Sequence, residues 1–209
     1  MNDNNFAVEL NYKLWVTKGA RFKASTRCEE ADTRYTRIVG WISSYLIIFS
    51  VLNICKIPFF TLPDNCASFL SIALSIIILV FSQFAYAKNF SVHSRNYHTC
   101  ALEISSLYNK LRFNKMNNNI VPELIEQIAN EYEQILMRYD NHLPIDLDMF
   151  KIEKTAYFKL SKYQTFLTKT RYFFLVQFVY YFCVYGLPLL YITICIIINI
   201  YKEKQYCLF

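Results

Sequence analysis

The 209-residue chain has a formal charge of +6, with 55% hydrophobic and 18% charged residues. Soluble domains average about 45–50% apolar and about 25% charged residues, so this composition favours a membrane protein. Three glycines are too few for glycine-rich phosphate loops or for a turn-rich all-β fold.

The chain begins with a basic stretch, residues 1–37, which holds seven Lys and Arg against five acidic residues. After Trp15 this stretch has no proline, so we expect one helix from about Glu9 into the first apolar run. Cationic side chains beside a membrane helix reach lipid headgroups and fix the topology. The alternative is a sensor surface for an anionic ligand. The candidate contacts in either case are Arg21, Arg27, Arg34 and Arg37.

Two apolar runs, residues 38–55 and 66–87, contain no Asp, Glu, Lys, Arg or His. A bilayer core about 30 Å thick needs roughly 20 apolar residues in a helix, and both runs fit that length. The turn between them, Lys56–Asn65, is too short to cross the membrane again. Residues 38–87 therefore predict a transmembrane hairpin of two antiparallel neighbouring helices.

Serines recur along one face of the second apolar run, at spacings of three, four and seven residues. Small hydroxyl side chains allow close helix contact or line a weakly polar path, and both roles stay open. The runs hold no charge, which disfavours a proton relay or a strongly selective transporter. The candidate pore or packing face is Ser68, Ser71, Ser75 and Ser82.

Residues 88–150 predict a pair of antiparallel helices that forms a stalk. Apolar residues recur at four-three spacing in residues 97–111 and again in residues 121–139. The polar stretch Asn114–Asn119 predicts the turn between the two helices.

The second helix of this pair ends in a polar corner, which we define by Asp140, Asn141, His142 and Asp146. Asn141 can stop a helix, and Pro144 prevents its continuation. One histidine with nearby carboxylates is a weak metal site, and no nucleophile accompanies it. We predict a structural corner with no catalytic residue, metal or cofactor; an enzyme that uses His142 is the alternative.

Residues 151–171 interleave Lys with Phe and Tyr, which is typical of a segment at a membrane surface. Binding of single-stranded nucleic acid is the alternative, and we do not expect it because an apolar run follows directly. That run, residues 172–201, predicts a third span over about 176–200, kinked at Pro188. It leaves a short tail, residues 202–209, on a side that the sequence leaves open.

Together these elements predict an all-α integral membrane protein with a transmembrane hairpin, a cytoplasmic antiparallel helix pair and an extra C-terminal transmembrane helix. Residues 88–171 hold twelve Lys and Arg, against one in the hairpin turn. The positive-inside rule therefore places the N-terminus and residues 88–171 in the cytoplasm.

Three stretches in this order resemble a known family: KLWVTKGARFKASTR before the first span, SRNYHTCALEISSLYNKL after the second, and EYEQILMRYDNHLPIDLD at the corner. Over about residues 10–150 the chain resembles the SLATT family, two-transmembrane effector domains associated with bacterial nucleotide-signalling systems. It is most similar to the subgroup found beside reverse transcriptases.

The resemblance implies a non-enzymatic effector of bacterial anti-phage defence in the inner membrane. Such an effector oligomerises and forms a pore when a nucleotide signal or a partner enzyme triggers it. The implied partners are the lipid bilayer, further copies of the chain, and a nucleotide-generating enzyme or reverse transcriptase encoded nearby. The alternative is a non-conducting scaffold or sensor that tethers a cytosolic partner through its stalk.

Overall fold

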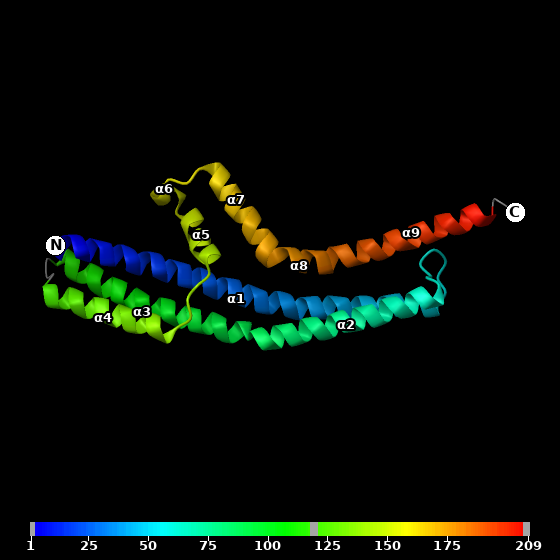
Figure 1. Cartoon of the computed structure of the whole chain (residues 1–209), viewed down its shortest axis with the longest axis horizontal. Coiled ribbons are helices and arrows are strands. Elements are labelled where there is room, and N and C mark those ends of the chain that lie inside the picture. Colours follow the sequence, from blue (N-terminus) through cyan, green and yellow to red (C-terminus); the bar gives the residue numbers. More distant parts are fainter. Residues whose placement is uncertain (1–2, 118–120, 207–209) are drawn as a thin grey trace. The chain divides into compact units, whose positions relative to one another are not determined.

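The computed structural model describes residues 3–117 and 121–206, in which every regular element is a helix (Figure 1). This confirms the predicted all-helical fold. The elements are α1 (Asp3–Ile54), α2 (Asp64–Lys88), α3 (Phe90–Met116), α4 (Pro122–Arg138), α5 (Pro144–Glu153), α6 (Thr155–Phe158), α7 (Lys162–Tyr172), α8 (Phe178–Tyr181) and α9 (Leu187–Tyr206), with π-helical segments η1 (Phe173–Gln177) and η2 (Phe182–Gly186).

The chain divides into two compact units. Unit 1 comprises the chain up to Ala31 and Phe90–Phe173, and unit 2 comprises Asp32–Asn89 and the chain from Phe174 onward. Helix α1 contributes to both units. Two predicted features fall partly outside the described residues, namely positions 118 and 119 of the polar turn and positions 207–209 of the tail.

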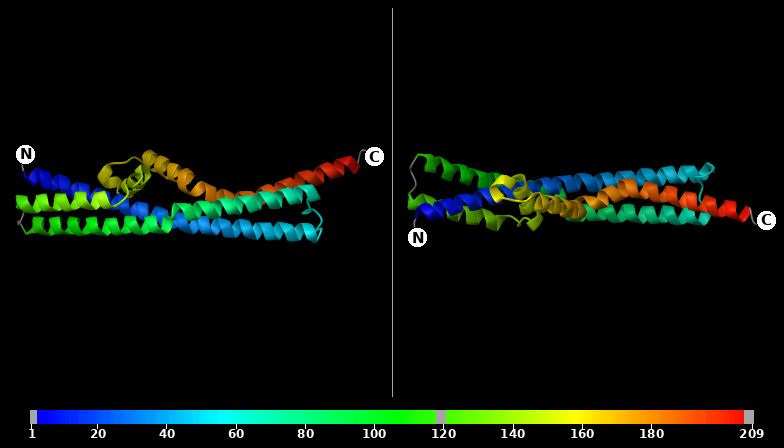
Figure 2. Two further views of the ribbon diagram at one scale, coloured as in Figure 1. Left: turned by 60° about the horizontal axis from the view of Figure 1, so that its bottom comes forward. Right: turned by 90° about the horizontal axis from the view of Figure 1, so that it is seen from above.

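Unit 1 is built on a core of three helices. Helices α3 and α4 run antiparallel, and the first half of α1 lies beside them (Figure 2). Apolar residues of α1 that the sequence analysis did not assign to a core are fully buried between these helices. The core residues are Ala7, Leu10, Leu14, Cys100, Ile104, Leu107, Leu111, Ile125, Ile128 and Ile135.

Helix α5 packs closely against α1 in the same unit. The ring of Phe150 lies so near Gly19 that a Cβ atom at that position would overlap it. The indole of Trp15 contacts Phe150 edge-on, with ring centroids 5.1 Å apart, and stacks on Phe158 at 5.8 Å. Phe158, an aromatic residue of the predicted surface segment 151–171, therefore contributes to the packing of unit 1.

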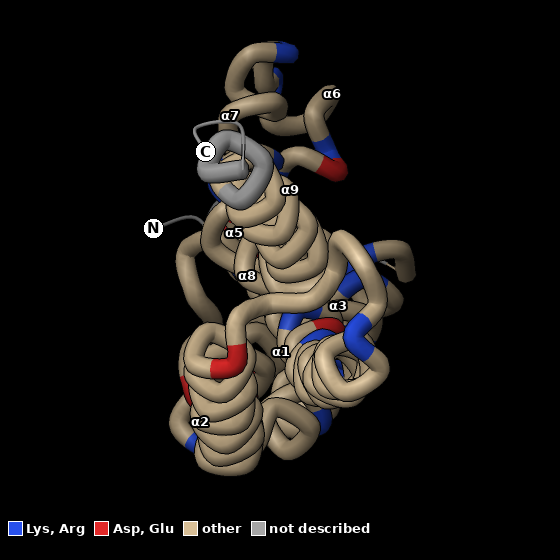
Figure 3. Tube along the Cα trace, turned by 90° about the vertical axis from the view of Figure 1, so that its right-hand side faces the viewer, with Lys and Arg blue, Asp and Glu red and all other residues tan. Residues whose placement is uncertain are grey.

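Unit 2 contains the three apolar runs. Among the described residues, three helices are long and apolar enough to cross a membrane, and they are Phe6–Ile54, Asp64–Met116 and Lys162–Tyr201. Between Asp64 in its first turn and Lys88 in its last turn, α2 has no charged residue, and the turns of α2 that face the viewer in Figure 3 are mostly tan. The buried core of the unit comprises Ile38, Ile42, Phe49, Leu62, Leu74, Cys183, Tyr191 and Cys195.

The third apolar run is irregular before Pro188. The sequence predicts a kink at that proline, and the structure has the π-helical segments η1 and η2 in the residues that precede it. Proline has no N–H group, so the carbonyl of Val184, four residues earlier, loses its helical donor. The Tyr45 hydroxyl donates to this oxygen instead, at 2.6 Å.

The hairpin turn is held by side chains of α1 and α9. The Asn53 side chain accepts a hydrogen bond from the Leu62 amide at 2.9 Å. From α9, the Tyr191 hydroxyl donates to the Phe60 carbonyl at 2.7 Å, and Asn199 Nδ2 donates to the Phe59 carbonyl at 3.0 Å. The third apolar helix is therefore bound to the turn between the first two.

Candidate functional site

The polar corner lies at the start of α5 in unit 1. Pro144 occupies the first turn of α5, where its missing N–H is not needed. The Leu143 amide donates to Asp146 Oδ2 at 2.9 Å, and the Asp146 amide donates to the Leu143 carbonyl at 3.0 Å. A carboxylate at a helix N-terminus is favoured by the helix dipole. Asp146 therefore fixes the point at which α5 begins.

The same carboxylate binds Arg27 of α1 through both of its oxygens. Arg27 Nε donates to Oδ1 at 2.7 Å and Nη2 donates to Oδ2 at 3.1 Å. The Asp146 side chain is 1% exposed and that of Arg27 is 12% exposed. Burial alone would lower the Arg27 pKa, but the hydrogen bond and the charge of Asp146 outweigh it and raise that pKa. We call this bidentate ion pair the Arg27–Asp146 clamp.

A second arginine of α1 binds the backbone of the corner. Arg21 is 2% exposed, and its Nη1 donates to the carbonyl oxygen of Asp140. The guanidinium lies 5.8 Å from the ring centroid of Tyr97 in α3. The Tyr97 hydroxyl donates to the Asn141 carbonyl at 3.0 Å. Two successive carbonyls of the corner are thus bound, one from α1 and one from α3.

His142 is half-buried at the centre of this arrangement. Its backbone amide donates to Asn141 Oδ1 at 3.0 Å. Burial lowers the His142 pKa, the positive charge of Arg21 lowers it further, and the Asp146 carboxylate acts in the opposite direction. Two buried nitrogens, His142 Nδ1 and Arg21 Nε, have no hydrogen-bond partner among the described residues. This environment therefore favours the neutral imidazole.

The structure brings together residues that the sequence analysis treated as two separate sets. Arg21 and Arg27 lie against the polar corner, where the fold uses both of their charged groups. Arg34 and Arg37 belong to unit 2. There Arg34 Nη1 donates to the Val176 carbonyl at 3.4 Å, and Arg37 is exposed. Only the first two arginines thus share a site with the corner.

The contribution of α1 and of Tyr97 to the site was not predicted. The sequence feature that could have indicated it is a repeat of three and four residues along α1. The other positions of this repeat are buried apolar residues, and Arg21 occupies one position of the same repeat. The buried positions of this repeat in unit 1 are Ala7, Leu10, Leu14, Arg21, Ala24, Cys28 and Ala31. A charged residue at a core position requires a buried partner, which the sequence alone does not name.

The corner contains little that could perform chemistry. Burial raises the pKa of the adjacent Cys28 thiol, which opposes formation of the nucleophilic thiolate. The part of the chain that the structure describes holds no group of three or more His, Cys, Asp and Glu side chains placed to bind a metal ion. The geometry is that of a clamp between α1 and the start of α5.

The family model SLATT_5, described as SMODS and SLOG-associating 2TM effector domain family 5, matches residues 3–201. This chain belongs to that family. No curated protein and no solved structure matches it. SLATT domains are membrane effectors associated with conflict systems and are generally non-enzymatic, and their name implies association with SMODS and SLOG systems.

The family match is longer than the resemblance over about residues 10–150 indicated. It reaches residue 201 and so includes the third apolar helix, although the family description counts two transmembrane segments. In this SLATT chain that helix is part of the matched domain.

The serine face of this SLATT chain lies beside the packed face of α2. Ser68 and Ser75 are exposed, whereas Ser71 and Ser82 are half-buried. Ser71 Oγ donates to the Ala67 carbonyl at 2.9 Å and Ser75 Oγ donates to the Ser71 carbonyl at 2.8 Å. These hydroxyls are bonded within their own helix. The residues of α2 that pack inside unit 2 are Ala67, Leu70, Leu74, Ile77, Ile78 and Phe81.

Proposed function

We propose that this chain is a pore-forming membrane effector of a bacterial anti-phage or related conflict system. The hairpin, residues 38–55 and 66–87, and the third helix within 172–201 span the inner membrane. The N-terminus and residues 88–171 lie in the cytoplasm. The observation that carries the proposal is the combination of SLATT membership with three helices apolar enough to cross a bilayer.

Assembly of several copies supplies the pore in this proposal. In lipid, helices associate through small residues and hydroxyls, because apolar side chains gain little by leaving the lipid tails. Ser68 and Ser75 are exposed in the single chain. In the most apolar stretch of their helix, only 6% of the residues are buried. The serine face is therefore available to a neighbouring copy, either for packing or as the lining of a weakly polar path.

In this proposal the activating signal or partner binds unit 1, which lies in the cytoplasm. We infer a partner of the nucleotide-generating class, or a reverse transcriptase encoded nearby, because SLATT domains are associated with SMODS and SLOG systems. The Arg27–Asp146 clamp joins α1, which continues into the first apolar run, to α5, which precedes the third run. A partner that loosens or tightens this clamp acts on the chain segments that enter the membrane.

Membrane potential tests the proposal directly. A voltage-sensitive dye is read in bacteria that express the full chain alone, and then with its neighbouring genes and an infection trigger. We expect depolarisation that requires the hairpin and that Ser75→Leu weakens. The control is Thr193→Leu on α9, since the Thr193 hydroxyl is also exposed and bonded within its own helix, to the Leu189 carbonyl at 2.8 Å.

One outcome would count against the pore, and another against the role of the serine face. Protein that is inserted and triggered but never changes the potential would leave the non-conducting scaffold as the function. Equal effects of Ser75→Leu and Thr193→Leu would remove the serine face from the proposal while keeping the pore.

A further inference from the structure

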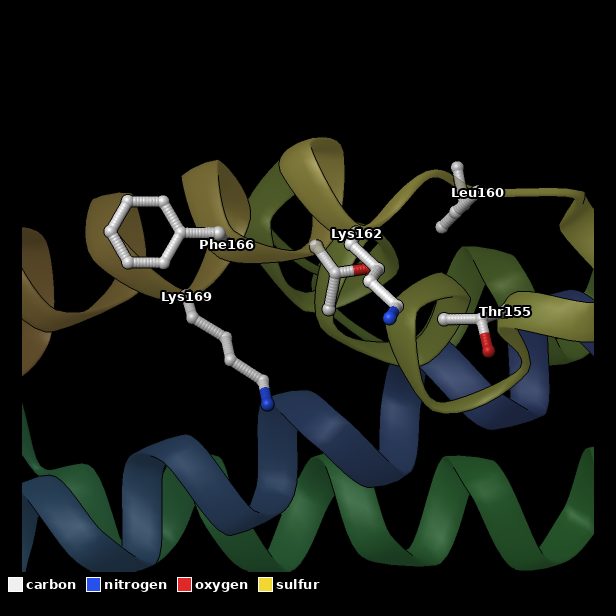
Figure 4. Close-up of a pocket in the computed structure, with 6 residues that line it drawn as sticks. Thr155, Leu160, Lys162, Phe166 and Lys169 are labelled. Atoms are coloured by element: carbon white, nitrogen blue, oxygen red, sulfur yellow. The ribbon is translucent and has the colours of Figure 1, made fainter.

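A basic pocket lies on unit 1 between α6, the loop that follows it and α7 (Figure 4). Its volume is about 370 Å³. Four of the lining residues follow the i, i+3, i+4, i+7 spacing of one face of α7. The residues that line the basic pocket are Thr155, Leu160, Lys162, Thr165, Phe166 and Lys169.

The pocket has a strong excess of positive charge. In Figure 4 the side chains of Lys162 and Lys169 extend from the same side of α7. Neither ammonium group forms an ion pair with any residue that the structure describes. The nearest acids in sequence are engaged elsewhere, since Glu153 pairs with Lys23, and Asp148 lies 3.9 Å from Arg171. A ligand of this pocket is therefore an anion.

The pocket has two threonine hydroxyls, and they differ in their hydrogen bonds within the protein. Thr165 Oγ1 donates to the Ser161 carbonyl at 3.1 Å. Thr155 forms no side-chain hydrogen bond with a described residue, so its hydroxyl can donate to a bound oxygen. Two ammonium groups and one hydroxyl suit a phosphate, whose oxygens accept several hydrogen bonds at once.

The position of α7 in the chain indicates where that phosphate comes from. The apolar helix Lys162–Tyr201 has 40 residues, which is roughly 60 Å of helix against a hydrocarbon core of about 30 Å. Because its charge-free part begins at Tyr172, α7 lies outside the hydrocarbon, at the depth of the headgroups. Tyr163 is 72% exposed and Phe166 is 67% exposed, as is typical of interfacial aromatic residues.

We propose that the basic pocket binds the phosphate of an anionic lipid headgroup. Lys162 and Lys169 pair with the phosphate oxygens, and the Thr155 hydroxyl donates to one of them. Phe166 and Leu160 contact the glycerol and the first methylene groups. This assignment rests on the proposed insertion of the third apolar helix in the membrane, and it fixes how deep that helix enters.

Lipid binding by the purified full-length chain tests the proposal. Phosphatidylglycerol is titrated against the protein in phosphatidylcholine nanodiscs, and bound lipid is counted by native mass spectrometry. The pocket variant is Lys162→Gln with Lys169→Gln. The control is Lys154→Gln with Lys159→Gln, which removes the same charge from the same segment but does not alter the pocket lining.

We expect the pocket variant to bind phosphatidylglycerol at least about tenfold more weakly, and the control to lose less than about threefold. Lys162→Arg with Lys169→Arg should retain binding, because the charges remain. Equal losses in the pocket variant and the control would overturn the pocket and leave only general surface attraction. Binding of inorganic phosphate as tight as that of the lipid would assign the pocket to a free anion instead.

Carbonate extraction of membranes separates failure of this inference from failure of the proposed function. A chain that is released into the supernatant is not an integral membrane protein, which overturns both. A chain that stays in the membrane but shows no preference for phosphatidylglycerol over phosphatidylcholine overturns the lipid pocket alone.

Discussion

Replacing Asp146 by Asn should destabilise unit 1 strongly, because it leaves the buried guanidinium of Arg27 without a counter-charge. Removing one partner of a buried ion pair costs about 3–5 kcal/mol. Arg27 keeps 12% exposure, and Asn retains one acceptor oxygen, so we expect about 3 kcal/mol. For a unit of this size that corresponds to a fall of roughly 10 °C in the melting temperature.

Tryptophan fluorescence can follow this unit by itself. The chain has two tryptophans, and Trp15 contacts Phe150 of α5 in unit 1. In a Trp41→Phe background, Trp15 therefore reports thermal unfolding of α5 from α1. The matched control is Asp148→Asn. The Asp148 carboxylate is partly exposed and lies 3.9 Å from Arg171, so this change should cost less than about 1 kcal/mol.

The reasoning on the clamp would be refuted if Asp146→Asn and Asp148→Asn shifted the melting temperature equally. A double substitution provides the second check. Arg27→Met with Asp146→Leu replaces the pair by apolar groups, which is often neutral in a buried site. It should therefore unfold at a higher temperature than Asp146→Asn alone, and a double variant as unstable as the single one would contradict the electrostatic explanation.

Three further predictions concern His142, Gly19 and Tyr45. The pKa of His142 in the folded chain lies below the ordinary 6.5. As the pH falls through 6.5, the unfolded chain therefore binds the proton before the folded chain does, and the free energy of unfolding decreases. His142→Gln should flatten this dependence of the melting temperature on pH. Gly19→Ala should cost about 1–3 kcal/mol in thermal unfolding, since its Cβ would overlap the buried Phe150 ring, whereas Gly40→Ala, with nothing within 4 Å, should be nearly neutral. Tyr45→Phe leaves the Val184 carbonyl without its donor and should cost about 1–3 kcal/mol; unchanged hydrogen exchange in residues 182–188 would contradict this.

The helical fold and the three apolar helices could be predicted because both depend on local sequence. In lipid, a charge-free run of about 20 residues can satisfy its own backbone hydrogen bonds only as a helix. Family membership was also visible, in three short stretches. The π-helical segments were not predicted, because Pro188 shows only that a helical hydrogen bond is lost. Where the freed carbonyl finds a donor depends on Tyr45, 139 residues away.

The site could be predicted only in part, because some of its contacts join residues that are far apart in the sequence. Asn141 and Pro144 mark a corner by their local chemistry. The partners of that corner are on α1 and α3, and Arg27 of α1 is 119 residues from Asp146 in the sequence. The basic residues of α1 obscured its repeat, so Arg21 was interpreted as a surface contact and not as a core residue. Arg21, a cation within an otherwise apolar repeat, is the pattern that could have indicated that this face of α1 packs against a polar partner.

The hydrogen bonds between α9 and the hairpin turn have a consequence for how the protein is made. Tyr191 and Asn199 lie 131 and 140 residues after the carbonyls of Phe60 and Phe59 to which they donate. At about 5–20 residues per second, a ribosome needs on the order of ten seconds to make that length of chain. During synthesis the first two apolar helices are therefore complete well before the donors for their connecting turn exist. The turn reaches its final form only when the last helix arrives.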